Sequence, residues 1–339
     1  MSVDARPRPD SSPRPPLAWP RLYGALWRIR CFESEVQRLA AAGEVPGFPH
    51  LSSGQEAVAV GVCAHLARED VLFTGHRGHG HLLAKGCDAA AMLAEILGRE
   101  TGLCRGRGGS MHLVDAACGV LGATGIVGGN LALAAGAAWA LQAQGVSHIS
   151  VVFFGDGATG AGVFHETLNL AALWKLPLLL VCENNGYAEF TARAEHSTVA
   201  LASAFAAPYG IAAATIDGND LLAVHGAAAD AVARVRRGEG PYLLECLTER
   251  LSGHYVGDAQ SYRSRTELMA LRERCPIERL RRHLLEAGVP AQELEAIALQ
   301  AALEIEHAVE RARAAPRPDP AGVLEGVYQA AALTPDRVP

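Results

Sequence analysis

Two polar motifs that each follow an apolar run have the residue types and the spacing for chemistry. GDG occupies positions 155–157 after the apolar run 148–154, and ENN occupies positions 183–185 after the run 178–182. The spacing of Asp156 and Asn185 matches one strand–helix–strand crossover, which would bring both side chains to one edge of a parallel sheet. A carboxylate and an amide oxygen suit Mg²⁺ better than zinc or copper, and the remaining charge of the ion suits phosphate oxygens. The pair therefore predicts a magnesium-bound phosphate ligand.

Glycines and a helix start support the same interpretation. Gly157 and Gly160 leave the backbone bare where a diphosphate must approach, and the helix expected at 161–174 adds its positive N-terminus. Each motif alone is a common turn former, so their joint occurrence at crossover spacing carries the prediction. Other expected strand ends add basic side chains to this edge: His76 and Arg77 after 71–74, and Arg250 and His254 after 242–247.

The elements that position these residues alternate along the chain. Short apolar runs at 71–74, 148–154, 178–182, 211–216 and 242–247 are separated by Ala-rich helical stretches, which predicts an α/β fold. Its sheet should be mostly parallel and covered by helices on both faces. One helix is expected at 20–43 and a second from Ser53, where Ser-x-x-Glu56 resembles a capping box.

The chain divides into three predicted segments. Residues 1–20 are rich in Pro, Arg and Ser and are expected to form a disordered arm. Residues 21–265 contain the α/β pattern. Residues 266–339 have helical periodicity with a Pro-rich break at 315–320, and are expected to form a helical C-terminal extension.

Composition excludes several classes of function. The formal net charge of −6 over 339 residues argues against a nucleic-acid partner, and no apolar run is long enough for a membrane span. The eight cysteines are scattered without a Cys-x-x-Cys pair, which indicates reduced thiols. The start of the chain lacks the apolar stretch of a signal peptide, so we expect a cytoplasmic protein.

Three other motifs are weaker candidates. His165-Glu166 opens like a zinc-protease helix, but Asn169 stands where a second histidine is needed. His76, His79 and His81 could hold a metal, although a phosphate loop beside Arg77 is the preferred interpretation. The GRGG stretch at 106–109 lacks the Lys-Ser/Thr of a nucleotide-binding loop and is expected to be flexible.

At this spacing, GDG followed by ENN resembles the thiamine diphosphate motif. From about residue 20 to 330 the chain is similar to the alpha subunit of the dehydrogenases that open the pyruvate, branched-chain 2-oxo acid and acetoin dehydrogenase complexes. The supporting stretches are GFPHLSSGQEAVAVG, TGHRGHG, RGRGGSMH, GIVGG, NLAALWKLP and GHYVGDAQSYR. The resemblance implies a thiamine diphosphate-binding fold, and thiamine diphosphate and Mg²⁺ as cofactors.

The resemblance also implies roles for individual residues. Asp156 and Asn185 would bind Mg²⁺ through their side chains and Tyr187 through its carbonyl oxygen. His50 and His254 would lie near the reacting carbon as catalytic residues. The cofactor itself would contact a larger set, which consists of His76, Arg77, Gly125, Val127, Asp156, Gly157, Ala158, Asn185 and Arg250.

Substrate and partners follow from the same resemblance. ENNGYAE and GHYVGDAQSYR are more similar to acetoin than to pyruvate dehydrogenases, which carry Arg and Ser where this chain has Gly186 and Tyr255. Ala123-Thr124 and Leu251-Ser252 depart from the family pattern, which keeps pyruvate, a branched-chain 2-oxo acid and a pathway-specific substrate open. The implied partners are a beta subunit, in an alpha2-beta2 heterotetramer, and a lipoyl-bearing acyltransferase that receives the acyl unit.

Two alternatives from other classes remain. The chain could be a non-catalytic diphosphate-binding scaffold subunit, although intact Asp156, Asn185, His50 and His254 argue against this. A nucleotide-using enzyme on a similar sheet is disfavoured because no Gly-x-Gly-x-x-Gly follows a strand.

Overall fold

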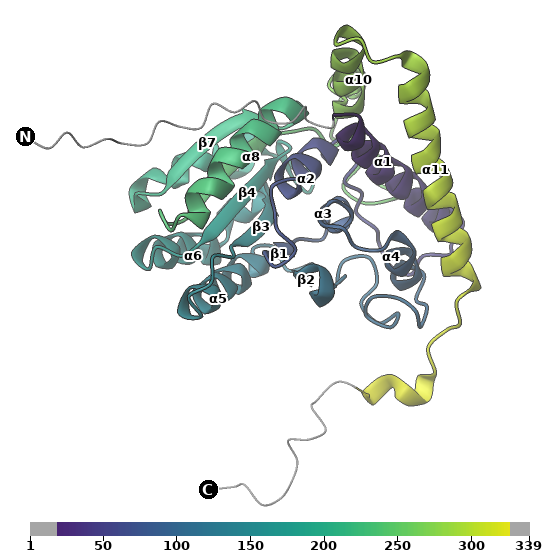
Figure 1. Ribbon diagram of the computed structural model, residues 1–339, viewed down its shortest axis with the longest axis horizontal. Helices are drawn as coiled ribbons and strands as arrows, with labels where there is room; N and C mark the ends of the chain where they lie inside the picture. Colours follow the sequence, from purple (N-terminus) through teal and green to yellow (C-terminus); the bar gives the residue numbers. More distant parts are fainter. Residues whose placement is uncertain (1–18, 326–339) are drawn as a thin grey trace, which may run out of the picture.

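The fold is built on one parallel sheet. The computed structural model describes residues 19–325, so the predicted arm lies outside the described residues except for its last two positions. Six strands follow the order β2-β1-β3-β4-β8-β7 (Figure 1). Their bounds are β1 Val71–Thr74, β2 Val120–Ala123, β3 Ser150–Gly155, β4 Leu178–Asn184, β7 Ala212–Asp217 and β8 Tyr242–Leu247. All pairs are parallel, which confirms the predicted α/β fold.

Helices cover both faces of this sheet, as the continuous apolar strands predict. Val151 and Phe153 belong to the core under α2 (Glu56–Cys63) and α8 (Leu221–Arg236). Val152 and Phe154 belong to the core under α5 (Gly129–Ala143) and α6 (Gly162–Leu173). Successive strand residues point to opposite faces, so residues 150–154 of β3 and all of β4 are buried on one side or the other.

The C-terminal helices pack along the first helix. α9 (Arg265–Glu273) and α10 (Pro276–Glu286) lead into α11 (Ala291–Ala314), which lies against α1 (Trp19–Ala41) and α4 (Ala89–Ile96) (Figure 1). Arg28 of α1 donates to Glu304 of α11 at 2.7 Å. α11 ends directly before the predicted break, and a short 3-10 helix, η5 (Pro320–Leu324), follows. None of the helices between residues 19 and 325 has the length and hydrophobicity of a membrane span.

Two local features differ from the sequence prediction. The helix expected from Ser53 begins at Glu56, and Gln55 at its N-cap makes no side-chain cap bond. Glu56 instead accepts hydrogen bonds from the Gly54 amide at 3.0 Å and from Arg30 at 2.6 Å, so tertiary pairing replaces the capping box. The edge strand β2 is absent from the predicted strands.

Candidate active site

A cavity of about 500 Å³ opens at the carboxyl ends of the strands. The chain passes from β1 to β2 on one side and from β3 to β4 on the other, so the strand order reverses between β1 and β3. Ligands bind at this kind of position in open parallel sheets. The cavity is lined by every predicted site residue except Asp156: His50, His76, Arg77, Gly125, Val127, Gly157, Ala158, Asn185, Tyr187, Arg250 and His254.

Two buried arginines line the cavity without a carboxylate bonded to either of them. Arg77 is 8% exposed and donates to two backbone carbonyl groups at 2.6 and 3.1 Å. Arg250 is 1% exposed and donates to the carbonyl oxygen of Glu189 and the hydroxyl of Tyr262. Burial and the charge of Arg250 lower the pKa of Arg77 to about 9. Two buried cations without a carboxylate partner suit a doubly anionic ligand such as a diphosphate.

Asp156 is buried beside this cavity, and neither of its carboxylate oxygens has a hydrogen-bond donor. It opens the 3-10 turn η2 (Asp156–Gly160) after β3, and its neighbours Gly157 and Ala158 line the cavity. The nearest basic side chains, Arg193 and His196, lie 3.8 and 3.5 Å from Oδ2. Burial raises the pKa of Asp156 against the opposing effect of these two groups. A buried carboxylate that accepts no hydrogen bond fits a divalent cation.

The two asparagines after β4 have different environments. Asn184 donates to the buried Glu245 at 2.7 Å and faces the protein interior. Asn185 lines the cavity, and its Nδ2 donates to Gln55 at 3.0 Å. Its Oδ1 accepts a long hydrogen bond from the Tyr187 amide at 3.3 Å. Asn185, not Asn184, is therefore the residue that can present an amide oxygen to a ligand.

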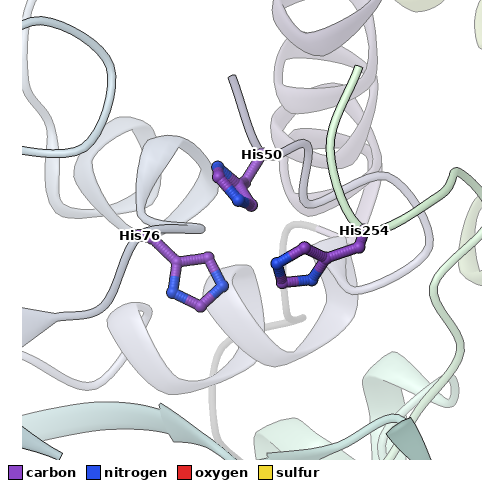
Figure 2. Close-up of side chains that lie close together, drawn as sticks. All are labelled: His50, His76 and His254. Atoms are coloured by element: carbon purple, nitrogen blue, oxygen red, sulfur yellow. The ribbon is translucent and has the colours of Figure 1, made fainter. Parts of the chain in front are cut away.

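Three histidines from separate segments converge at the cavity (Figure 2). The ring centroids lie 4.7 Å apart for His50 and His76, 4.8 Å for His50 and His254, and 5.6 Å for His76 and His254. Burial, followed by the charge of Arg77, lowers the pKa of His50 to about 4, of His254 to about 3 and of His76 to about 2. All three rings are neutral near pH 7, so each has one donor and one acceptor nitrogen for proton handling.

His79 and His81, which follow His76 in the chain, have different partners. His79 is bonded to Glu33 at 2.9 Å and to the hydroxyl of Ser110 at 3.0 Å. His81 lies 3.2 Å from Glu183, which also lines the cavity. These side chains hold the loops in place, and the alternative of a metal bound by His76, His79 and His81 gains no support.

The GRGG loop is ordered by one buried carboxylate. Glu95 of α4 is fully buried and accepts four backbone N–H groups at 2.7 to 3.2 Å, from Cys104, Gly106, Gly108 and Gly109. The prediction of a flexible loop is therefore wrong. Because the loop is fixed, it brings Met111 to the cavity wall.

Asp258 positions the loop that carries His254. Its carboxylate accepts hydrogen bonds from the amides of His254 at 2.6 Å and Gln260 at 2.8 Å, and from the hydroxyl of Tyr262 at 2.7 Å. A Cβ at Gly253 would lie 2.6 Å from Asp258, so the turn needs glycine. The GHYVGDAQSYR stretch contains these residues, but their partners become clear only from the fold.

Gln55 and Glu183 are cavity residues that sequence reasoning missed. Gln55 reaches Asn185 from a position 130 residues away in the chain, and no local motif marks it. Glu183 belongs to the ENN motif, yet its partner His81 comes from helix α3 (His79–Lys85), far away in the sequence. Together the cavity combines two arginines, an amide and three neutral imidazoles, with the buried carboxylate of Asp156 beside it, an arrangement that can bind a metal–diphosphate and move protons.

Known proteins are similar to this chain over most of its length. The dehydrogenase E1 component family matches residues 25–321. The alpha subunit of acetoin:2,6-dichlorophenolindophenol oxidoreductase from Bacillus subtilis is 47% identical over 308 residues, 91% of this chain and 92% of the relative. The same subunit from Cupriavidus necator is 45% identical over 91% of this chain and 93% of the relative.

A pyruvate dehydrogenase subunit is also similar. The E1 component subunit alpha from Zymomonas mobilis is 41% identical over 298 residues, 87% of this chain and 84% of the relative. These similarities confirm the family that the motifs predicted. The chain belongs to the dehydrogenase E1 component family of thiamine-diphosphate-dependent oxidoreductases.

Proposed function

We propose that this chain is the alpha subunit of a dehydrogenase that cleaves acetoin with thiamine diphosphate and Mg²⁺. The observation that carries the cofactor assignment is the pair Arg77 and Arg250. Both guanidinium groups are buried at the cavity, and neither is bonded to a carboxylate. A diphosphate supplies the missing negative charge.

The cavity residues divide into three proposed roles. Asp156 and Asn185 hold Mg²⁺ through side-chain oxygens and Tyr187 through its carbonyl oxygen. His76, Arg77 and Arg250 hold the diphosphate, with the bare backbone of Gly157 and Ala158 close to it. The backbone of Gly125 and Val127 contacts the aminopyrimidine ring.

Bound thiamine diphosphate supplies a nucleophilic carbon that adds to a carbonyl group and permits cleavage of the adjacent carbon–carbon bond. His50 and His254 are the groups that hold or accept protons at the substrate, because both rings are neutral and face the cavity. Asp258 keeps His254 in place through its backbone amide.

Acetoin is the proposed substrate because two relatives at 47% and 45% identity are named for acetoin oxidation. Gly186 and Tyr255 agree with this choice. The alternative is decarboxylation of pyruvate or a branched-chain 2-oxo acid, since a pyruvate dehydrogenase subunit is 41% identical.

The proposal also includes a beta subunit in an alpha2-beta2 heterotetramer, a lipoyl-bearing acyltransferase and a cytoplasmic location. Ile126 and Val127 line the cavity but are 73% and 56% exposed, which is unusual for apolar side chains at a binding site. A partner subunit that covers them would close the pocket.

We further propose residues 21–265 as the cofactor-binding domain and 266–339 as an extension that packs on it.

Thermal unfolding with different ligands tests the cofactor assignment. Thiamine diphosphate should raise the melting temperature only when Mg²⁺ is present, and saturation at a hundred times Kd should add about 2.7 kcal/mol. ATP should give no comparable shift. Stabilisation by ATP alone would support a nucleotide enzyme. Stabilisation by thiamine diphosphate without turnover in the assembled complex would support a scaffold subunit.

A further inference from the structure

A second cluster of ligand-type side chains lies away from the cavity. Cys87 follows Gly86 at the end of α3 (His79–Lys85), while Asp115 caps and Cys118 ends the 3-10 turn η1 (Ala116–Cys118) that leads into β2. The two sulfur atoms and a carboxylate oxygen all lie within 4.8 Å of one another. Tetrahedral coordination at metal–ligand distances of about 2.0–2.3 Å therefore requires only small side-chain shifts.

The surroundings leave this cluster available to a cation. Cys87 is 1% exposed, whereas Asp115 and Cys118 are partly exposed, so an ion can enter from one side. The nearby cations have other partners: Lys85 donates to two backbone carbonyls, and Arg68 donates to the carbonyl of Ala117. Among the described residues, no lysine or arginine forms an ion pair with Asp115.

We propose that Cys87, Asp115 and Cys118 form a binding site for a thiophilic divalent cation, with Zn²⁺ as the best fit. Two soft thiolates and one carboxylate favour Zn²⁺ over Mg²⁺. The carbonyl oxygen of Gly86, 3.7 Å from Cys118 Sγ, or a water molecule takes the fourth position. Binding replaces one proton on each thiol, so two protons are released per ion.

A disulfide between the same cysteines is the competing use. A disulfide would use the two sulfur atoms alone, whereas the Asp115 carboxylate lies within 4.8 Å of both of them. The same carboxylate is a ligand for a cation. The cluster therefore favours metal binding over oxidation.

The ion would join two segments that shape the cofactor cavity. Cys87 follows the helix that begins after His76 and Arg77, and Cys118 precedes β2, which leads to Gly125 and Val127. β2 is at the edge of the sheet and is held by β1 alone. Binding to the native state stabilises it by mass action, so the ion should raise the melting temperature of the whole chain.

Cobalt titration of the reduced, chelator-treated full-length chain tests the site. With excess Mg²⁺ present, one Co²⁺ per chain should produce sulfur-to-cobalt charge-transfer absorption and release two protons, and Zn²⁺ should abolish the absorption. Cys118→Ser should lower affinity by roughly tenfold or more, because loss of an outer partner alone costs 10–100-fold. Cys104→Ser is the matched control: this half-buried thiol lies beside backbone carbonyls on another loop.

Asp115→Asn gives a second variant if Cys118→Ser does not fold, and it should weaken binding while keeping the charge-transfer absorption. The proposal is overturned if Co²⁺ gives no charge-transfer absorption, or if the absorption is lost with Cys104→Ser and retained with Cys118→Ser. If the chain binds no metal and peroxide treatment lowers its mass by two hydrogens, the proposal is also overturned, in favour of a disulfide.

Discussion

At the scale of single residues, the cavity contains charges that a ligand must balance. Arg77 and Arg250 have no bonded carboxylate, and Asp156 has no hydrogen-bond donor. Such groups cost stability in the free protein and are stabilised when a metal–diphosphate binds. Variants at these positions should therefore affect cofactor binding far more than folding.

Asp156→Asn should abolish Mg²⁺-dependent binding of thiamine diphosphate, because it removes the only anionic ligand proposed for the ion. The free chain should lose no more than about 1 kcal/mol, since the buried carboxylate accepts no hydrogen bond and burial outweighs its long contacts with Arg193 and His196. Calorimetric titration and thermal unfolding measure the two effects. Glu166→Gln, an exposed carboxylate on α6, is the control and should leave both unchanged. Unchanged cofactor affinity in Asp156→Asn would contradict the metal assignment.

The histidine cluster should make the free chain less stable in acid. The pKa of folded His50 is about 4, below the ordinary 6.5, so between these values only the unfolded chain binds the proton. Stability therefore falls as pH drops below 6.5, and His50→Gln should reduce this loss by about 1–2 kcal/mol at pH 5. Denaturant unfolding at pH 7 and pH 5 measures this change in the free energy of unfolding. His307 is exposed on α11, so His307→Gln should lose as much stability between pH 7 and pH 5 as the wild type. An equal loss in His50→Gln would refute the prediction.

At the scale of elements, the turn after β3 must approach the short hairpin β5 (Tyr187–Ala188) and β6 (Thr191–Ala192). A Cβ at Gly157 would lie 2.8 Å from the Cβ of Ala188, next to Tyr187. Gly157→Ala should therefore displace the hairpin and weaken Mg²⁺–thiamine diphosphate binding by roughly tenfold, about 1.4 kcal/mol. Gly160, which the sequence also placed at the diphosphate, does not line the cavity, and its Cβ would meet no atom within 4 Å, so Gly160→Ala is the matched control. Equal affinities in the two variants would show that this approach is unimportant.

The sequence allowed prediction of elements that are apolar and bounded by turn-forming residues. β1 and β8 match their predicted runs, and the crossover that links Asp156 to Asn185 is α6, within one residue of the predicted bounds. β2 was missed because VLGA is short and contains a glycine. The Ser53 capping box failed because Glu56 pairs with Arg30 from another helix. Contacts such as Glu95 with its loop depend on tertiary structure, which local patterns do not encode.

At the scale of the whole molecule, the chain offers one side of a binding site. The exposed Ile126 and Val127 lie at the cavity, and further large apolar side chains are exposed on α5 and α6 or directly after them: Leu133, Trp139, Leu170, Leu173 and Trp174. Exposed apolar groups of this extent indicate a protein interface. The proposed beta subunit would bury them and supply the carboxylic acid for the pyrimidine ring.

Acetoin-dependent dye reduction by the chain with and without its beta subunit tests the account most directly. The purified chain with excess thiamine diphosphate and Mg²⁺ should show no turnover, because half of the pocket is missing. Adding the beta subunit should restore dye reduction together with a tetramer-sized species, with acetoin preferred over pyruvate. Turnover by the isolated chain, free of any partner, would contradict this assignment and point to Glu183 or Glu189, two glutamates that line the cavity, as the activating acid.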